Sequence, residues 1–139
     1  MKTPENNIDV FIFSFGFKHG EPRTPSEADL IFDVRDLPNP YWEDALRPFS
    51  GEEEKIKKFF STRPEVLHKL DELEGLILNH LQSPHVIEKS KKNQNYLYSI
   101  GIGCTGGKHR SVFAVSELAK RLTEKYPSVR FDHRDKNKW

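Results

Sequence analysis

Cysteine is nearly absent from this chain of 139 residues, which contains a single one, Cys104. One thiol excludes an internal disulfide and a zinc site built from several cysteines. Long apolar runs are absent as well, and none approaches the roughly 20 residues that span a bilayer. The first residues, MKTPENNID, lack the apolar centre of a signal peptide. We therefore expect a cytoplasmic protein with no membrane contact.

An excess of charge of one sign is also missing. Lys and Arg number 22 against 21 Asp and Glu, a formal net charge of +1. Any nucleic-acid contact would therefore need a local basic patch. Hydrophobic residues are only 35% of the chain, but 139 residues are enough to bury the core of one domain. We expect residues 1–139 to form that single domain.

The pattern of apolar residues predicts an α/β fold with a central sheet of about four strands. The stretches typical of strands are Ile8–Phe17, Ala28–Arg35, Tyr96–Gly103 and Ser128–Phe131. Between the first two, and on to Pro48, the chain is rich in proline and should be an ordered loop. Trp42 in this loop is expected to pack in the core.

Helical periodicity is predicted in three places, which are Glu52–Phe60, Thr62 to about Ser83, and Lys108–Tyr126. Capping boxes that begin at Ser50 and Thr62 are expected to open the first two helices. The polar stretch Glu88–Asn95 is expected to be a loop. The order of elements implies a strand–helix–strand crossover near the C-terminus.

The chemistry concentrates in one turn, GCTGGKHRS, from Gly103 to Ser111. Glycines after a strand let several backbone N–H groups point into one space, and the next helix adds its positive N-terminal end. Lys108, His109 and Arg110 add cationic side chains, and Arg110 can grip two oxygens of one phosphate. The turn therefore predicts a binding site for phosphate or carboxylate, against the plainer reading of a connector whose charges face water.

The same turn also fits a catalytic template. Cys104 and Arg110 have the Cys-x5-Arg spacing of cysteine-dependent phosphatases, in which the thiolate attacks phosphorus while the loop and arginine hold its oxygens. Such an enzyme also needs a carboxylic acid for the leaving group. Asp33 and Asp36 are conceivable, and nothing in the sequence selects either. No spacing supports a metal site, and no cofactor is expected.

Five blocks in order give the chain a family resemblance. They are SFGFKHG, DLIFDVRDLPNPYW, LRPFSG, IGCTGGKHRSV and a late HR. Together they resemble the C-terminal domain of the RapZ (YvcJ-like) RNase adapter family, over essentially the whole chain. The resemblance implies a three-layer α/β sandwich similar to a phosphofructokinase subdomain. It also implies a homo-oligomer, and a protein that acts as a sensor or adapter.

Members of that family carry an N-terminal nucleotide-binding domain with a Walker A loop. No G-x-x-x-x-G-K-[ST] occurs in this chain, so we expect a standalone domain without nucleotide hydrolysis. The resemblance implies binding of an amino-sugar phosphate such as glucosamine-6-phosphate. It further implies RNA and a regulatory protein as partners. The ending FDHRDKNKW has two Asp among its cations, unlike the strongly basic tail of RNA-binding members.

The expected ligand-binding residues come from two arguments. By resemblance they are His19 and the turn residues Cys104, Thr105, Gly106, Gly107, Lys108, His109 and Arg110. Arg35 and Arg47 are added because each places a cation near a strand end or in a loop of a matching block. His133 and Arg134 are the expected RNA-binding residues. An RNA-binding module and the phosphatase remain the alternatives to a metabolite sensor.

Overall fold

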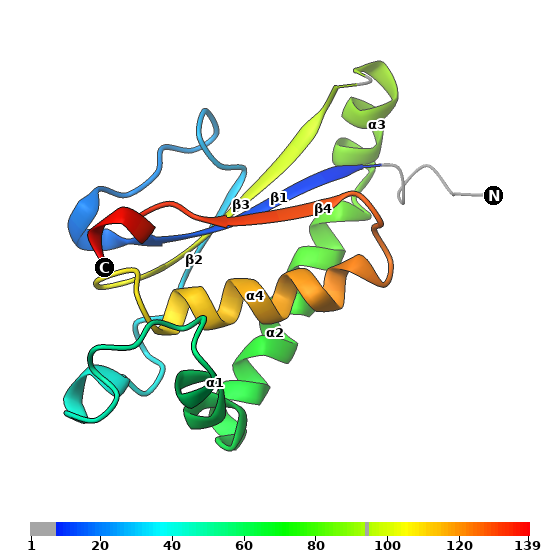
Figure 1. Ribbon diagram of the computed structural model, residues 1–139. Helices are drawn as coiled ribbons and strands as arrows, with labels where there is room; N and C mark the ends of the chain where they lie inside the picture. The colour runs from blue at the N-terminus through cyan, green and yellow to red at the C-terminus, as the bar shows by residue number, and fades with distance from the viewer. Residues whose placement is uncertain (1–7, 94) are drawn as a thin grey trace.

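A computed structural model describes residues 8–93 and 95–139 of the protein. Residues 1–7, to which the expectation of no signal peptide refers, and Gln94 lie outside the described residues. The α/β class and a sheet of four strands are confirmed (Figure 1). The strands are β1 (Asp9–Gly16), β2 (Leu30–Asp33), β3 (Leu97–Cys104) and β4 (Val129–His133). The helices are α1 (Glu54–Ser61), α2 (Pro64–Leu81), α3 (Pro84–Lys92) and α4 (Arg110–Thr123), with short 3₁₀ turns η2 (Phe17–His19), η3 (Pro40–Trp42) and η4 (Lys136–Lys138).

The sheet is parallel throughout, in the order β2-β3-β1-β4. Strands β1 and β3 pair over their full length, from Asp9 opposite Leu97 to Gly16 opposite Cys104. Both are central, and their nearly continuous apolar sequences suit strands that are covered on both faces. The predicted crossover at the C-terminal end is confirmed, because α4 connects β3 to β4 across β1.

The sheet is the middle of three layers (Figure 1). On one face α4 packs against β1, β3 and β4, and α2 and α1 pack against α4. The main core lies between these helices and inward side chains such as Ile12 and Ile100. On the opposite face, Phe13, Phe15 and Ala28 form a second, smaller core beneath the segment between β1 and β2. The three-layer arrangement predicted from the sequence is thus confirmed.

Two local predictions were wrong. Residues 88–92 belong to helix α3, not to a loop, because Pro84 occupies its first turn and the Ser83 hydroxyl accepts a hydrogen bond from the Val86 N–H at its start. Neither capping box forms. The N-cap of α1 is Glu53 and that of α2 is Arg63, and neither side chain caps its helix. Thr62 instead ends α1, where its hydroxyl donates to the carbonyl of Lys58 at 3.1 Å.

The topology places a switch point between the C-terminal ends of β1 and β3. After β1 the chain crosses to β2 over the face that carries the smaller core, and after β3 it crosses to β4 over the face that carries the helices. Adjacent parallel strands whose connections depart to opposite faces form a switch point, where open α/β sheets bind ligands. Among the described residues, none of the helices combines the length and hydropathy needed to cross a bilayer.

Candidate functional site

The turn after β3 and the turn after β1 are built against each other at this switch point. Gly107 has a φ of +72°, and a Cβ at this position would lie 2.6 Å from the backbone nitrogen of Gly16. A Cβ on Gly16 would in turn lie 2.6 Å from the carbonyl carbon of Gly106. The N–H of Lys18 also donates to the carbonyl of Thr105 at 3.2 Å. The glycines are therefore required by close backbone packing, which brings Lys18 beside the turn.

Arg110 is the first residue of α4, and its side chain is buried at 6% exposure. One terminal nitrogen donates to the carbonyl of Arg35 at 2.6 Å and lies 3.4 Å from that of Leu37. The other lies 3.4 Å from the hydroxyl oxygen of Thr105. The buried Nε has no hydrogen-bond partner among the described residues. The described hydrogen-bond acceptors of this guanidinium are neutral oxygens, and its charge also helps to lower the pKa of Asp33, after the larger effect of Arg35.

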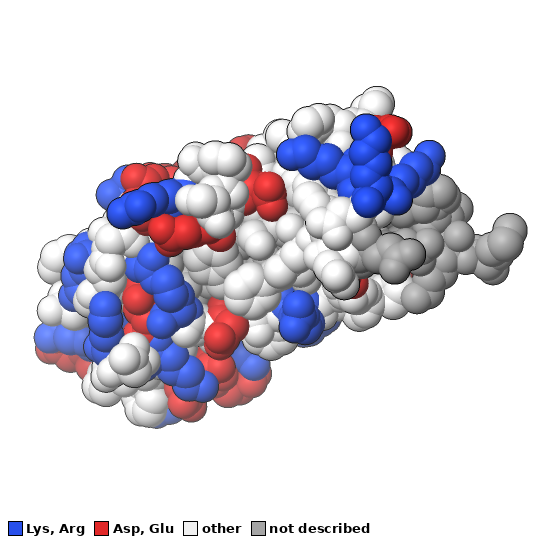
Figure 2. Space-filling model, turned by 90° about the horizontal axis from the view of Figure 1, so that it is seen from above, with Lys and Arg blue, Asp and Glu red and all other residues white. Residues whose placement is uncertain are grey.

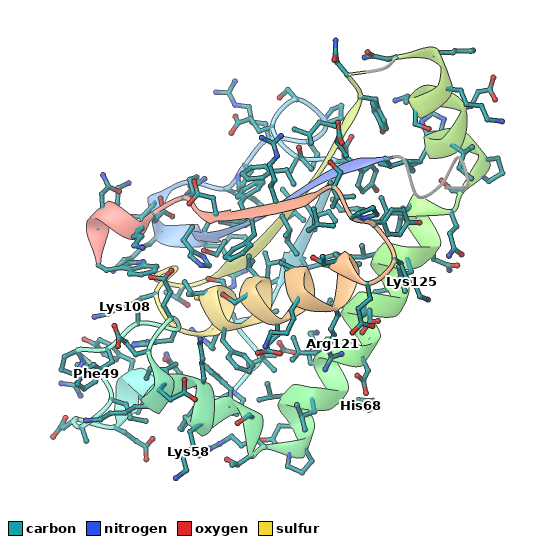
Figure 3. All side chains as sticks on the ribbon, turned by 45° about the vertical axis from the view of Figure 1, so that its right-hand side comes forward. Phe49, Lys58, His68, Lys108, Arg121 and Lys125 are labelled. Carbon is teal, nitrogen blue, oxygen red and sulfur yellow. The ribbon has the colours of Figure 1, made fainter. Side chains whose placement is uncertain are left out.

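Lys108 and His109 bind the segment that precedes α1 to the turn. Lys108 Nζ donates to the carbonyl of Arg47 at 3.1 Å, and the Gly51 N–H donates to the carbonyl of Lys108 at 2.8 Å. His109 Nε2 hydrogen-bonds the carbonyl of Phe49. Burial lowers the pKa of His109, although the Phe49 carbonyl opposes this by favouring the charged ring. Figure 3 shows Lys108 and Phe49 close together at one end of the molecule.

A cleft of about 490 Å³ opens at this edge of the sheet. Its lining residues are Lys18, His19, Asn39, Tyr41, Trp42, Cys104, Thr105, Gly106, Lys108, His109, Arg110, Lys138 and Trp139. No Asp or Glu side chain is among the described residues of this lining. A volume of this size suits a small organic ligand.

Three of the expected binding residues do not line the cleft. Arg35 forms an ion pair of 2.7 Å with Asp33 and stacks on a phenylalanine ring. Arg47 pairs with Asp44 at 2.9 Å. The carbonyl of Gly107 points toward the C-terminal residues. The two arginines, selected because each places a cation near a strand end or in a loop, are thus paired with neighbouring acids, which sequence position alone does not reveal.

Cys104, the last residue of β3, contributes to the cleft wall but is almost fully buried at 2% exposure. Its Sγ lies 3.2 Å from the Oγ of Ser111, the second residue of α4. The thiol is therefore held between strand and helix. Within the described residues, no group of three His, Cys, Asp or Glu side chains has a geometry that would hold a metal ion.

The C-terminal segment closes one side of the site, which the sequence did not predict. The Trp139 indole N–H donates to the Gly107 carbonyl at 2.8 Å. The Asp135 carboxylate accepts the Gly16 N–H at 2.7 Å and pairs with Arg134. Burial alone would raise the pKa of Asp135, but these hydrogen bonds outweigh it and lower that pKa. Hydrogen bonds therefore connect the C-terminal segment directly to the end of β1 and to the turn after β3.

His133 and Arg134, the expected RNA-binding pair, have different environments. His133 is 5% exposed, and its Nδ1 shares a hydrogen bond of 2.8 Å with the buried Ser14 hydroxyl. Burial lowers the pKa of His133, against the opposing charge of Glu52. Arg134 is exposed but ion-paired with Asp135. The structure therefore leaves only Arg134 of this pair at the surface.

Sequence reasoning missed several lining residues. Asn39, Tyr41 and Trp42 lie in a proline-rich loop more than 60 residues before the turn. Trp42 was expected in the core, and this was wrong because it is 77% exposed. The available signal was the Asn-Pro-aromatic sequence at the end of the block DLIFDVRDLPNPYW.

The fold and the cleft define a small parallel α/β domain with a concave site at its switch point. The RapZ C-terminal domain family matches residues 8–137. The chain therefore belongs to the RapZ C-terminal domain family.

Relatives with this domain are considerably longer. A protein of Laribacter hongkongensis named "Nucleotide-binding protein" is 48% identical over 126 residues, which are 91% of this chain and 42% of that protein. A protein of the same name from Shewanella woodyi is 45% identical over 122 residues, 88% of this chain and 40% of its own length. The chain thus spans about 40% of the length of the curated relatives it matches.

Proposed function

We propose that this domain binds a phosphorylated small molecule, an amino-sugar phosphate such as glucosamine-6-phosphate, in the cleft beside the turn 104–110, and that it acts as a sensor or adapter. The observation that carries the proposal is an excess of positive side chains. Lys18, Lys108 and Arg110 line a cleft to which no described Asp or Glu side chain contributes. The side-chain hydrogen bonds of Lys108 and Arg110 go to carbonyl and hydroxyl oxygens, which are neutral.

The geometry supports an anion rather than a neutral ligand. The glycine turn leads into a helix of 14 residues, whose positive end faces the same region. Arg110 is held by its carbonyl partners in one orientation, so little side-chain entropy remains to be lost on binding. Its buried Nε lacks a partner, and a ligand oxygen would supply one.

The amine and the sugar in this proposal come from the family resemblance. The relatives are named for nucleotide binding, but they are more than twice as long as the matched region. A nucleotide therefore belongs in the test panel. The resemblance also supports RNA and a protein as partners, and self-association, as parts of an adapter role.

The test is calorimetry with glucosamine-6-phosphate, glucose-6-phosphate, AMP and inorganic phosphate. We expect Arg110→Ala to weaken binding of the phosphate esters by about 1.5–3 kcal/mol, the usual contribution of a charge-assisted hydrogen bond. Arg23→Ala is the matched control, since the exposed Arg23 side chain pairs with Glu27 and does not line the cleft. Unchanged affinity in Arg110→Ala, with the fold intact by thermal unfolding, would remove the site from this turn.

The phosphatase alternative is less well supported by the geometry. Hydrogen bonds from Arg35 lower the pKa of Asp33, whereas a general acid needs a raised one. Asp36 is exposed and pairs with Lys69 at 3.3 Å, and neither acid lines the cleft. Vanadate-sensitive release of phosphate by the wild type, lost in Cys104→Ser, would reverse this ranking.

A further inference from the structure

An exposed pair of aromatic rings stands at the cleft. Tyr41 and Trp42 are 49% and 77% exposed, and both line it. Single exposed aromatics are common on protein surfaces. This pair differs because its rings meet edge to face, with centroids 5.6 Å apart, on the wall of a concave site.

The backbone that carries the two rings is well braced. The Asn39 side chain accepts the Tyr41 N–H at 3.1 Å, and Pro40 occupies the first position of η3. The guanidinium of Arg47 donates to the Tyr41 carbonyl at 2.8 Å and lies 4.7 Å from the centre of its ring. One face of Tyr41 is therefore occupied, while Trp42 remains mostly free.

The segment that carries Tyr41 and Trp42 is also connected by hydrogen bonds to the turn 104–110. Lys108, which lines the cleft, donates to the carbonyl of the same Arg47 that braces Tyr41. The distance between the cations and the rings is thus set by hydrogen bonds and not by a free loop. Exposing an indole to water is unfavourable, and a ligand that covers it recovers that free energy.

We propose that Trp42 is the platform on which the sugar ring of the ligand packs, with its phosphate on the turn 104–110. The inference rests on the proposed function and adds the residue that distinguishes a sugar phosphate from a bare phosphate. A pyranose has one apolar face of C–H groups, which fits an aromatic ring, and hydroxyls around its edge. Asn39, Thr105 and His19 line the cleft nearby and offer hydrogen-bonding groups to those hydroxyls.

The test compares two ligands on three variants by calorimetry. Trp42→Ala should weaken binding of glucosamine-6-phosphate about tenfold, the effect of about 1.4 kcal/mol of aromatic contact. Its affinity for inorganic phosphate should not change, because that ligand does not reach the ring. Trp42→Phe should retain most of the sugar-phosphate affinity. Leu76→Ala, which removes another exposed apolar side chain, on α2, is the matched control.

The outcomes separate this inference from the proposed function. If the wild type binds both ligands and Trp42→Ala binds both equally well, the site stands and the platform is wrong. If Trp42→Ala loses both ligands equally, Trp42 supports the turn and is not a ring platform. If the wild type binds neither, both proposals fail. The thermal unfolding of Trp42→Ala should match the wild type, because a side chain that is 77% exposed contributes little to the core.

Discussion

Gly107 is the residue at which the backbone of the candidate site is most constrained. Its φ of +72° is unfavourable for any residue with a side chain, and a Cβ would lie 2.6 Å from the Gly16 nitrogen. Gly106, one position earlier, is different, since a Cβ there would meet nothing closer than the Lys18 side chain at 3.9 Å. The two adjacent glycines therefore serve different purposes.

We expect Gly107→Ala to lower the free energy of unfolding by more than about 2 kcal/mol, because a left-handed conformation costs roughly 1–2 kcal/mol and the overlap with Gly16 adds to it. Gly106→Ala is the matched control and should change stability by less than about 0.5 kcal/mol. Urea unfolding of the ligand-free proteins measures both. Equal losses in the two variants would contradict the close packing of the turns.

Two buried histidines predict the response to acid. Burial lowers the pKa of both His109 and His133 below the ordinary 6.5, so between the two values the unfolded chain binds more protons than the folded one. The contribution of the two neutral rings to the free energy of unfolding should thus be fully present above about pH 6.5. It should decrease as the pH falls below this value, until the folded-state pKa is passed. Asp33 and Asp135, whose pKa values are lowered from 3.8, weaken the fold only in more acidic solution, below about pH 4.

Urea unfolding at about pH 7.5 and about pH 5.5 checks this prediction. His133→Asn should reduce the loss of stability between the two conditions. His68→Asn is the control, because His68 lies exposed on α2 (Figure 3). A wild type that gains stability on acidification over this range would contradict the inferred burial of the two rings in their neutral form.

At the scale of elements, the strands were the easiest to predict and the helix ends the hardest. All four strands occur where they were predicted. The central strands β1 and β3 are mostly buried and need apolar runs, whereas the edge strands β2 and β4 are shorter and more exposed. The capping boxes failed because Ser and Thr hydroxyls also serve turns and helix ends. Ser50 accepts the Glu52 N–H at 3.2 Å in a turn before α1, and Thr62 closes α1.

Helix α3 was missed for a different reason. Its sequence has many lysines and a single buried side chain, Val86, so apolar periodicity is almost absent. The second helix was predicted to end at about Ser83, just before Pro84, and α2 does end at Leu81, but a proline in the first turn also favours a new helix. Ser83 before it serves as the N-cap, with its hydroxyl 3.4 Å from the Val86 nitrogen. Local end signals, and not periodicity, define such a helix.

At the scale of the whole molecule, the candidate site joins segments that are far apart in sequence. The turn 104–110 was predicted because its residues are contiguous and chemically distinctive. Trp139 and the segment with Asn39 and Trp42 reach the same cleft only through the tertiary fold, and no local pattern connects either of them to the turn 104–110. Arg35 and Arg47 were predicted to bind the ligand. The sequence did not show that their side chains pair with Asp33 and Asp44 in the folded protein.

The chain has nearly equal numbers of basic and acidic residues, 22 and 21. On the face seen from above, Figure 2 shows basic and acidic side chains mixed over the left part and a mostly basic group at the upper right. At the C-terminus, Arg134 is paired with Asp135 and Lys136 with Glu52. An RNA phosphate would have to compete with these carboxylates for each cation.

We therefore expect single-stranded RNA to bind this domain weakly and almost entirely through electrostatics. The logarithm of the binding constant should fall with the logarithm of salt concentration by about 0.7 for each phosphate neutralised. Arg134→Ala should reduce that slope by less than about one phosphate contact, since its charge is already shared with Asp135. Lys58→Ala, on α1, is the matched control for loss of one surface charge. Fluorescence anisotropy over a salt series measures the slope. A tight complex that is insensitive to salt would mean that base contacts, and not phosphate contacts, hold the RNA, and would place RNA recognition on a surface other than the C-terminal segment.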